Sequence, residues 1–572
     1  MKEAVRRHLE QFRQEVEEAG NQLRGRKMPE VTEELFGLYE KNGNRLLYEN
    51  VYFPRRKYLA TFGLLSIWYG RKEDLEMLEY VIRDICQEKT WALPAHVERS
   101  EEDWEKTVDL FASETGHTLS ELSWVLKDQL SEETRTLIRE KVLERVIDSY
   151  LAKPEGGWRW EHFKNNWAAV CAGSIGSAAI YLLDQADERR KVCLERVLRD
   201  LDTYLEGMKD DGTCPEGLSY FTYGMTYYVG FAELLYRDSE GKIDLMANPL
   251  AERTARFQQL CYYPGGVTVS FSDGMSHDKY RMGLTCYLAL RYPGVEIPDV
   301  SAAMGFNTDS CFRFMGLYRE DLWCRRYLEE AEEKTESEAE KEAGFHVLPS
   351  AQWVVAKAGN GAGMGVKGGH NGESHNHNDV GNFFYLAGGE MFITDLGCGE
   401  YTKDYFHEKR YTIFCNRSLG HNVPLIGGKE QLEGEEYHAE RFETDEEKMR
   451  VEIEFASAYP AGTAKKLERH LTWNRDGVLN VEDYFQVPET EEILENLVTQ
   501  IEPEITGEGE LILKGKQAVV RLKAEGCGEF QVTRECFMNH FGVAEDVWRI
   551  DWKVETEAGR AVSRFVVETV GK

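Results

Sequence analysis

The chain has 572 residues, of which 42% are hydrophobic and 30% charged, and a formal net charge of −32. The length exceeds what one hydrophobic core usually organises, so we expect two or three domains. A surface this acidic excludes partners that bind through a basic field, namely nucleic acid and anionic membranes. An acidic substrate would therefore need a local cluster of cationic and amide side chains.

The N-terminus leads into a polar helix and lacks the apolar core of a secretory signal. No run of roughly 18 apolar residues is present, so we expect no membrane-spanning helix. The twelve cysteines show no C-x-x-C spacing, and Cys171, Cys193 and Cys286 lie in apolar helical patterns typical of buried thiols. We therefore expect a cytoplasmic protein, or a periplasmic or secreted one if a leader has been removed.

The first part of the chain, residues 1–328, is predicted to be helical. Apolar residues recur at helical spacing, as in Leu59, Phe62, Leu65 and Trp68. Further helices are expected in pairs at 118–130 and 132–151, 167–183 and 188–207, and 219–236 and 249–261. Successive helical hairpins with Gly, Pro, Asp or Asn in their connections predict an incomplete (α/α) toroid.

The pattern changes after a charged stretch at residues 329–343, which we interpret as a solvated linker. Residues 344–572 alternate between apolar and polar positions, as strands do. Strands are expected at 353–357, 390–394, 449–455, 479–485 and 562–567. This part is predicted to be an antiparallel β-sandwich, which makes the fold class multidomain α+β.

Two histidines one residue apart, His375 and His377, begin the most distinctive segment of the chain. In an extended segment both rings would face one site. Asp395 follows a strand-like run, and His421 lies between Gly420 and Asn422. Two histidines and a carboxylate suit one divalent metal, zinc or manganese, and leave a third histidine for proton chemistry.

Two segments of the helical part also contain candidate site residues. The first, residues 158–167, contains Trp158, Trp160 and His162 and ends with Asn165, Asn166 and Trp167 at a predicted helix start. Asparagine is a common N-cap, but tryptophans beside cationic groups are also typical of carbohydrate clefts. In the second segment, Tyr220 follows Glu216 at the start of another helix and is placed to point into a cleft.

In this order, the motifs resemble those of the heparinase II/III-like polysaccharide lyases, a group that includes alginate lyases. The resemblance rests on the helical half and on four short motifs. These are Asn165-Asn166-Trp167, Glu216-Gly217-Leu218-Ser219-Tyr220, the His-x-His-x-Asp segment at 375–379, and Arg417-Ser418-Leu419-Gly420-His421-Asn422. The resemblance implies a toroid joined to a β-sandwich and β-elimination at a uronic acid.

The resemblance also implies a role for each motif residue. Tyr220 and His375 would be the acid and base, and Asn165 or Asn166 would bind the uronate carboxylate. His377, Asp395 and His421 would hold the metal. Asn166 stands where some relatives have a second catalytic histidine, so this chain resembles the Asn/Tyr/His variety. We expect Trp158, Trp160, His162, Glu216 and His96 to contact an acidic oligosaccharide or polysaccharide, and we leave a homo-oligomer open.

Three other functions stay open at this point. An inverting glycoside hydrolase would use Asp211 and Glu216 as acid and base. A non-haem iron oxygenase would use the His-x-His pair with a later histidine. A non-catalytic glycan-binding protein would share the fold without the chemistry.

Overall fold

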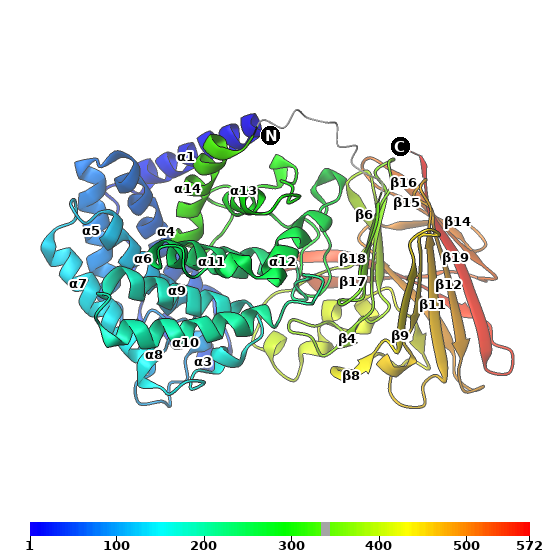
Figure 1. Cartoon of the computed structure of the whole chain (residues 1–572). Coiled ribbons are helices and arrows are strands. Elements are labelled where there is room, and N and C mark those ends of the chain that lie inside the picture. The colour runs from blue at the N-terminus through cyan, green and yellow to red at the C-terminus, as the bar shows by residue number, and fades with distance from the viewer. Residues whose placement is uncertain (333–343, 572) are drawn as a thin grey trace. The chain divides into compact units, whose positions relative to one another are not determined.

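The computed structural model describes residues 1–332 and 344–571. Contacts divide the chain into two compact units. The first, here the helical unit, comprises Met1–Met208, Tyr220–Ala255 and Lys279–Glu333. The second, here the β-rich unit, comprises Lys209–Ser219, Arg256–Asp278 and Lys334–Lys572. Figure 1 labels many of the elements of both units.

The helical unit is built from an inner and an outer set of helices. The helices are α1 (Lys2–Leu23), α2 (Glu33–Phe36), α3 (Leu38–Asn42), α4 (Leu46–Tyr69), α5 (Lys72–Cys86), α6 (Leu110–Val125), α7 (Glu132–Val142), α8 (Asp148–Ala152), α9 (Asn166–Leu182), α10 (Glu188–Leu205), α11 (Leu218–Asp238), α12 (Pro249–Leu260), α13 (Met282–Arg291) and α14 (Phe314–Glu330). Helices α6 and α9 are buried nearly all round, whereas α5, α7 and α10 bury one stripe each. Helices buried on every side belong to the interior of an α-helical fold, and striped ones to its outer layer.

The predicted helices are present, with two differences. The helix expected at 118–130 is α6, which begins earlier and runs Leu110–Val125. The stretch 132–151, predicted as a single helix, is α7 and α8 joined by a π-helical segment at Leu143–Ile147. A π-segment shifts the helical register, which a simple apolar periodicity does not reveal. Of the linker predicted at 329–343, residues 333–343 lie outside the described residues.

The β-rich unit contains antiparallel sheets of five, eight, four and two strands. Their orders are β1-β2-β3-β5-β6, β14-β15-β16-β19-β12-β11-β10-β9, β17-β18-β13-β7 and β4-β8. The strands are β1 (Gly344–Leu348), β2 (Trp353–Lys357), β3 (Gly363–Lys367), β4 (His370–Asn371), β5 (Phe383–Ala387), β6 (Glu390–Ile393), β7 (Leu425–Ile426), β8 (Gly434–His438), β9 (Arg441–Asp445), β10 (Arg450–Glu454), β11 (Lys466–Trp473), β12 (Leu479–Gln486), β13 (Ile493–Thr499), β14 (Pro503–Gly507), β15 (Glu510–Lys514), β16 (Val519–Glu525), β17 (Gln531–Met538), β18 (Ala544–Val554) and β19 (Arg560–Gly571).

One hydrophobic core joins the sheets. Val354 and Phe383 of the five-stranded sheet share it with Val451, Leu471 and Phe565 of the eight-stranded sheet. Along β12, buried and more exposed residues alternate, which is the pattern of a sheet with one face in a core. The predicted fold class, a helical part followed by an antiparallel β-sandwich, is confirmed.

Two short segments from the first half of the chain are part of the β-rich unit and bring residues to its loops. In the segment 256–278, the Tyr263 hydroxyl donates to the Met364 carbonyl oxygen at 2.6 Å. The Ser270 hydroxyl donates to the Asp395 carbonyl oxygen at 3.0 Å. These buried hydrogen bonds fix the turn that follows Ser270, and this turn carries Asp273.

All twelve cysteines are free, and Cys171, Cys193 and Cys286 are buried, as predicted. Among the described residues, no helix combines the length and the apolar character needed to cross a bilayer.

Candidate functional site

The segment that carries His375 and His377 is a loop between β4 and β5. His375 adopts a left-handed conformation with φ of 58°, which is uncommon for a residue with a side chain. The inference from an extended segment is therefore wrong in its geometry. The two rings nevertheless meet at one group, the carboxylate of Asp273.

Asp273 is buried and accepts hydrogen bonds from five side chains, one of which is the Tyr401 hydroxyl at 3.2 Å. The other distances are 2.6 Å from Nδ1 of His375, 3.0 Å from Nε2 of His377, 2.6 Å from the Tyr405 hydroxyl and 3.1 Å from the Arg410 guanidinium. Burial alone would raise the pKa of Asp273, but the Arg410 charge and the two histidine hydrogen bonds outweigh it and hold the pKa well below its usual range. Asp273 is thus a fixed anion behind His375.

Sequence reasoning missed Asp273. It lies 102 residues before His375, in a Ser272-Asp273-Gly274 turn that resembles any other polar turn. The local signal is limited to Ser272, whose φ is 61°, and a strained turn is not visible in the sequence.

His375 also lies close to Glu216, another residue of the predicted site. Nε2 of His375 is 3.5 Å from Oε1 of Glu216, and the Glu216 side chain is buried. The hydrogen bond from Nδ1 of His375 to Asp273 fixes the orientation of the ring and turns Nε2 toward Glu216. Nε2 is therefore the nitrogen that a reacting group would meet.

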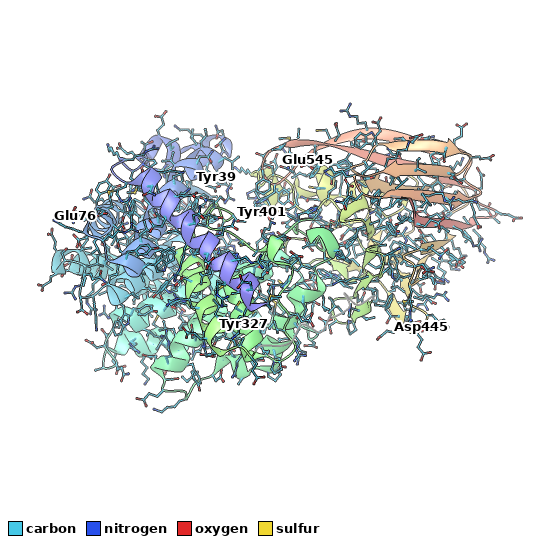
Figure 2. The ribbon with its side chains drawn as sticks, turned by 90° about the horizontal axis from the view of Figure 1, so that it is seen from above. Tyr39, Glu76, Tyr327, Tyr401, Asp445 and Glu545 are labelled. Atoms are coloured by element: carbon cyan, nitrogen blue, oxygen red, sulfur yellow. The ribbon has the colours of Figure 1, made fainter. Side chains whose placement is uncertain are left out.

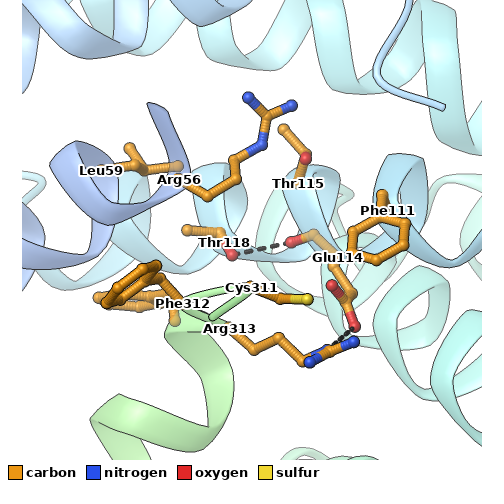
Figure 3. A pocket seen from close by; sticks show the side chains of 10 residues that line it. Arg56, Leu59, Phe111, Glu114, Thr115, Thr118, Cys311, Phe312 and Arg313 are labelled. Atoms are coloured by element: carbon orange, nitrogen blue, oxygen red, sulfur yellow. Dashed lines mark hydrogen bonds and ion pairs between the residues drawn. The ribbon is translucent and has the colours of Figure 1, made fainter. Parts of the chain in front are cut away.

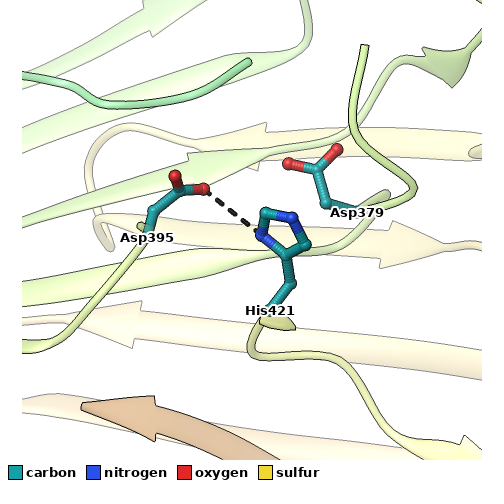
Figure 4. A group of neighbouring side chains, drawn as sticks. All are labelled: Asp379, Asp395 and His421. Atoms are coloured by element: carbon teal, nitrogen blue, oxygen red, sulfur yellow. Dashed lines mark ion pairs between the residues drawn. The ribbon is translucent and has the colours of Figure 1, made fainter. Parts of the chain in front are cut away.

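Asp395 and His421 form the second part of the site, together with Asp379 (Figure 4). Nδ1 of His421 is 3.5 Å from Oδ2 of Asp395, and the ligand atoms of all three residues lie within 4.8 Å of one another. All three side chains are fully buried. Nε2 of His421 donates to the Cys415 carbonyl oxygen at 2.9 Å, which leaves Nδ1 as the nitrogen with a lone pair.

The atoms around this group suit a divalent metal. Nδ1 of His377 and Oδ2 of Asp379 are both buried and have no hydrogen-bond partner among the described residues. The rings of His377 and His421 are 5.2 Å apart. Asp379 was not among the predicted ligands, and its other oxygen accepts from Nζ of Lys367 at 2.6 Å. Buried atoms of this kind carry a free-energy cost that a bound cation would remove.

In the helical unit, His96, Asn165 and Asn166 lie where α6 and α9 begin. Asn165 is the N-cap of α9 and accepts from the Trp167 backbone amide at 3.0 Å, and Asn166 is buried in the first turn. His96 bonds to the Asp109 carboxylate at 2.7 Å and touches the Trp167 ring, with 4.8 Å between ring centres. Tyr220 lies half-buried in the first turn of α11.

Two tryptophans predicted to contact a glycan have the surroundings of packing residues. The indoles of Trp158 and Trp160 are 8% and 3% exposed, and they donate to the carbonyl oxygens of Tyr150 and Val108. With both faces covered, neither ring offers a surface to a sugar. His162 is exposed, and its Nε2 bonds to the Gly156 carbonyl oxygen.

A pocket of the helical unit lies between α4, α6 and the start of α14 (Figure 3). Arg313 and Glu114 line it and are joined at 3.1 Å. Tyr223, which lies one helical turn after Tyr220, donates its hydroxyl hydrogen to the same Glu114 oxygen at 2.5 Å. Burial raises the pKa of Tyr223 well above its usual range, which favours the protonated hydroxyl.

In the alternative hydrolase site, one of the two proposed carboxylates, Asp211, is bonded to backbone amides of nearby loops. Oδ2 of Asp211 accepts from the backbone amides of Ser350 and Ala351, and Oδ1 accepts from that of Thr213. A carboxylate whose two oxygens are bonded to three backbone amides holds a loop in place.

Comparison with known proteins gives a consistent result. Residues 334–563 match the family model described as "Heparinase II/III-like, C-terminal". No curated protein matches the chain. Among solved structures, heparinase III is 13% identical and aligns over 99% of this chain and 92% of its own, with a TM-score of 0.64.

Two further structures share the fold. A mutant of the heparan sulfate lyase HepC of Pedobacter heparinus is 12% identical over 92% of this chain and 77% of its own, with a TM-score of 0.62. A mutant of the chondroitin AC lyase of Streptomyces coelicolor A3 is 11% identical over 99% of this chain and 82% of its own, with a TM-score of 0.50. The resemblance expected from the motifs is confirmed.

Proposed function

We propose that this chain, whose residues 334–563 match the heparinase II/III-like C-terminal family model, is a polysaccharide lyase that cleaves uronate-containing glycans by β-elimination. The observation that carries the proposal is the histidine His375, held on the buried anion Asp273. The named lyases that share the fold support a glycosaminoglycan as the substrate. Alginate and other acidic glycans are the alternatives within the same chemistry.

In the proposed reaction, a base removes the C5 proton of the uronate and the C4–O4 bond breaks. The electron pair of the C5–H bond becomes the C4=C5 double bond, and an acid returns a proton to O4. We assign these proton transfers to Tyr220 and His375, with Nε2 as the reacting nitrogen of the histidine. Asn165 or Asn166 would donate to the uronate carboxylate and offset its charge as C5 loses its proton.

A divalent metal, for which we propose zinc, would be held by His377, Asp395 and His421. It would organise the loop that carries His375 and supply no proton itself. The donor set of imidazoles and carboxylates is one that zinc and manganese accept. His377 bonds to Asp273 through Nε2, so the same carboxylate orients a metal ligand and the reacting histidine.

The test of the proposed function is the ultraviolet absorbance of the unsaturated product, measured on a panel of uronate glycans. We expect the wild-type chain to produce it from at least one glycan. Tyr220→Phe and His375→Ala should each lower kcat by about 100-fold or more, because each removes a proton-transfer group. If Tyr220→Phe keeps full activity while Glu216→Gln abolishes it, the lyase assignment fails. Binding without turnover across the panel would favour a glycan-binding protein.

The metal is tested by elemental analysis of the purified chain. We expect about one zinc per chain in the wild type and a large loss in Asp395→Ala and His421→Ala, because each variant removes a ligand. Glu452→Ala is the control, since Glu452 lies with Glu468 and His470 in a second acidic group that Arg441, Arg450 and Lys466 already neutralise. Equal metal content in Asp395→Ala and Glu452→Ala would contradict the assignment.

A further inference from the structure

The tip of the β17–β18 hairpin presents a large aromatic side chain to solvent. Phe541 is 75% exposed. The tip is held in shape by Asn539, whose Oδ1 accepts from the backbone amides of Phe541 and Val543, both at 3.0 Å. The side-chain amide nitrogen of Asn539 donates to the Glu545 carboxylate at 2.6 Å. Glu545 is labelled in Figure 2, as is Tyr401, whose ring lies near the hairpin tip. Phe541 is therefore displayed by an ordered turn.

A continuous row of rings connects this tip to His375. Ring centres are 5.5 Å apart from Phe541 to His540, 4.7 Å from His540 to Tyr401 and 4.9 Å from Tyr401 to Phe406. The Phe406 and His375 rings are 6.5 Å apart. The backbone amide of Glu400 donates to the Met538 carbonyl oxygen, which ties the hairpin to the loop that carries Tyr401 and Phe406.

Phe406, the ring next to His375 in this row, is 44% exposed, so the row has an exposed phenylalanine at the tip and another beside His375. Large aromatic side chains left in water beside a reacting group are typical of ligand-binding surfaces. The apolar C–H face of a pyranose ring is the matching surface, since it packs on an aromatic face and keeps its hydroxyls in water.

The negative charge of Glu400 near the hairpin tip favours one class of sugar over others. Gly542 at the tip lies close to Glu400: a β-carbon added to Gly542 would be 3.8 Å from the Glu400 carboxylate. A carboxylate accepts hydrogen bonds from sugar hydroxyls and amides but repels a uronate or a sulfate. The ring that suits this surface is therefore a neutral sugar.

We propose that Phe406 and Phe541 form an aromatic platform for neutral pyranose rings that flank the uronate processed at His375, with one ring stacked on each phenylalanine. This inference rests on the proposed lyase function and adds a subsite to it. Trp158 and Trp160, which were predicted to contact the glycan, have covered faces. The exposed aromatic rings proposed for that contact are instead two phenylalanines of the β-rich unit.

The experiment measures KM and kcat for Phe541→Ala and Phe406→Ala, and the affinity of an uncleaved oligosaccharide for the same variants in the His375→Ala background. An aromatic contact of ordinary strength predicts that each variant raises KM and Kd by about 2- to 10-fold, with kcat changed less than twofold. Phe541→Tyr should recover most of the lost affinity. Ile505→Ala is the matched control, because Ile505 is 53% exposed on β14.

The outcomes separate the platform from the lyase function. Cleavage by the wild type with unchanged KM and Kd in both phenylalanine variants would overturn the platform and leave the lyase function intact. If the wild type cleaves no uronate glycan, titration with a neutral N-acetylhexosamine oligosaccharide decides. Binding that Phe541→Ala weakens supports the platform, and no binding overturns it.

Discussion

Replacing Asp273 by asparagine will lower kcat by about 100-fold or more and leave KM within a few-fold of the wild type. The carboxylate accepts the Nδ1 proton of His375 at 2.6 Å and stabilises the charged ring that forms when Nε2 takes a proton. An amide of the same size keeps the shape but removes the negative charge. The measurement is steady-state kinetics by ultraviolet product absorbance on the cleaved glycan.

Tyr405→Phe is the matched control for this prediction. It removes the hydrogen bond to Oδ1 of Asp273 and leaves the contact between Oδ2 and His375 in place. We expect a loss in kcat below about 10-fold, since the carboxylate keeps its charge and its partner. If Asp273→Asn retains more than a tenth of the wild-type kcat while folded and metal-loaded, Asp273 does not orient the reacting histidine.

The fold was predictable because its signals are local. Apolar spacing predicts the helices, and alternation predicts strands such as β2 and β12, whose bounds match to within one residue. The π-segment in 132–151 was not predictable, because one extra residue per turn leaves the apolar spacing nearly unchanged. The candidate site was predictable only where its residues share a short motif.

Asp273 shows why the rest could not be predicted. Its role comes from contacts with His375, His377, Tyr405 and Arg410, which lie 102 to 137 residues further along the chain. Nothing in a Ser-Asp-Gly turn indicates such partners. Trp158 and Trp160 show the reverse case, because their residue type suggests a sugar contact and only tertiary packing covers them.

Replacing Arg469 by methionine will lower the free energy of unfolding of the β-rich unit by about 3–5 kcal/mol. Arg469 is fully buried on β11 and bonds to Asp483 through Nε at 2.8 Å. Burial and the Asp483 charge raise the pKa of Glu495 well above its usual range, so Glu495 holds its proton and Arg469 is the main counter-charge of Asp483. The methionine variant leaves that carboxylate buried without its cation.

The same change reaches the candidate site, because Nη1 of Arg469 donates to the carbonyl oxygens of Gly381 and Asn422 at 2.8 and 2.6 Å. These residues lie beside Asp379 and His421, so the variant should also lose metal affinity. Urea unfolding gives the stability change, and elemental analysis gives the metal content. Arg441→Met is the control, since its pair with Glu468 is partly exposed and should contribute no more than about 1 kcal/mol. Equal costs for the two arginines would mean that burial of the Arg469–Asp483 pair does not govern the stability of this unit.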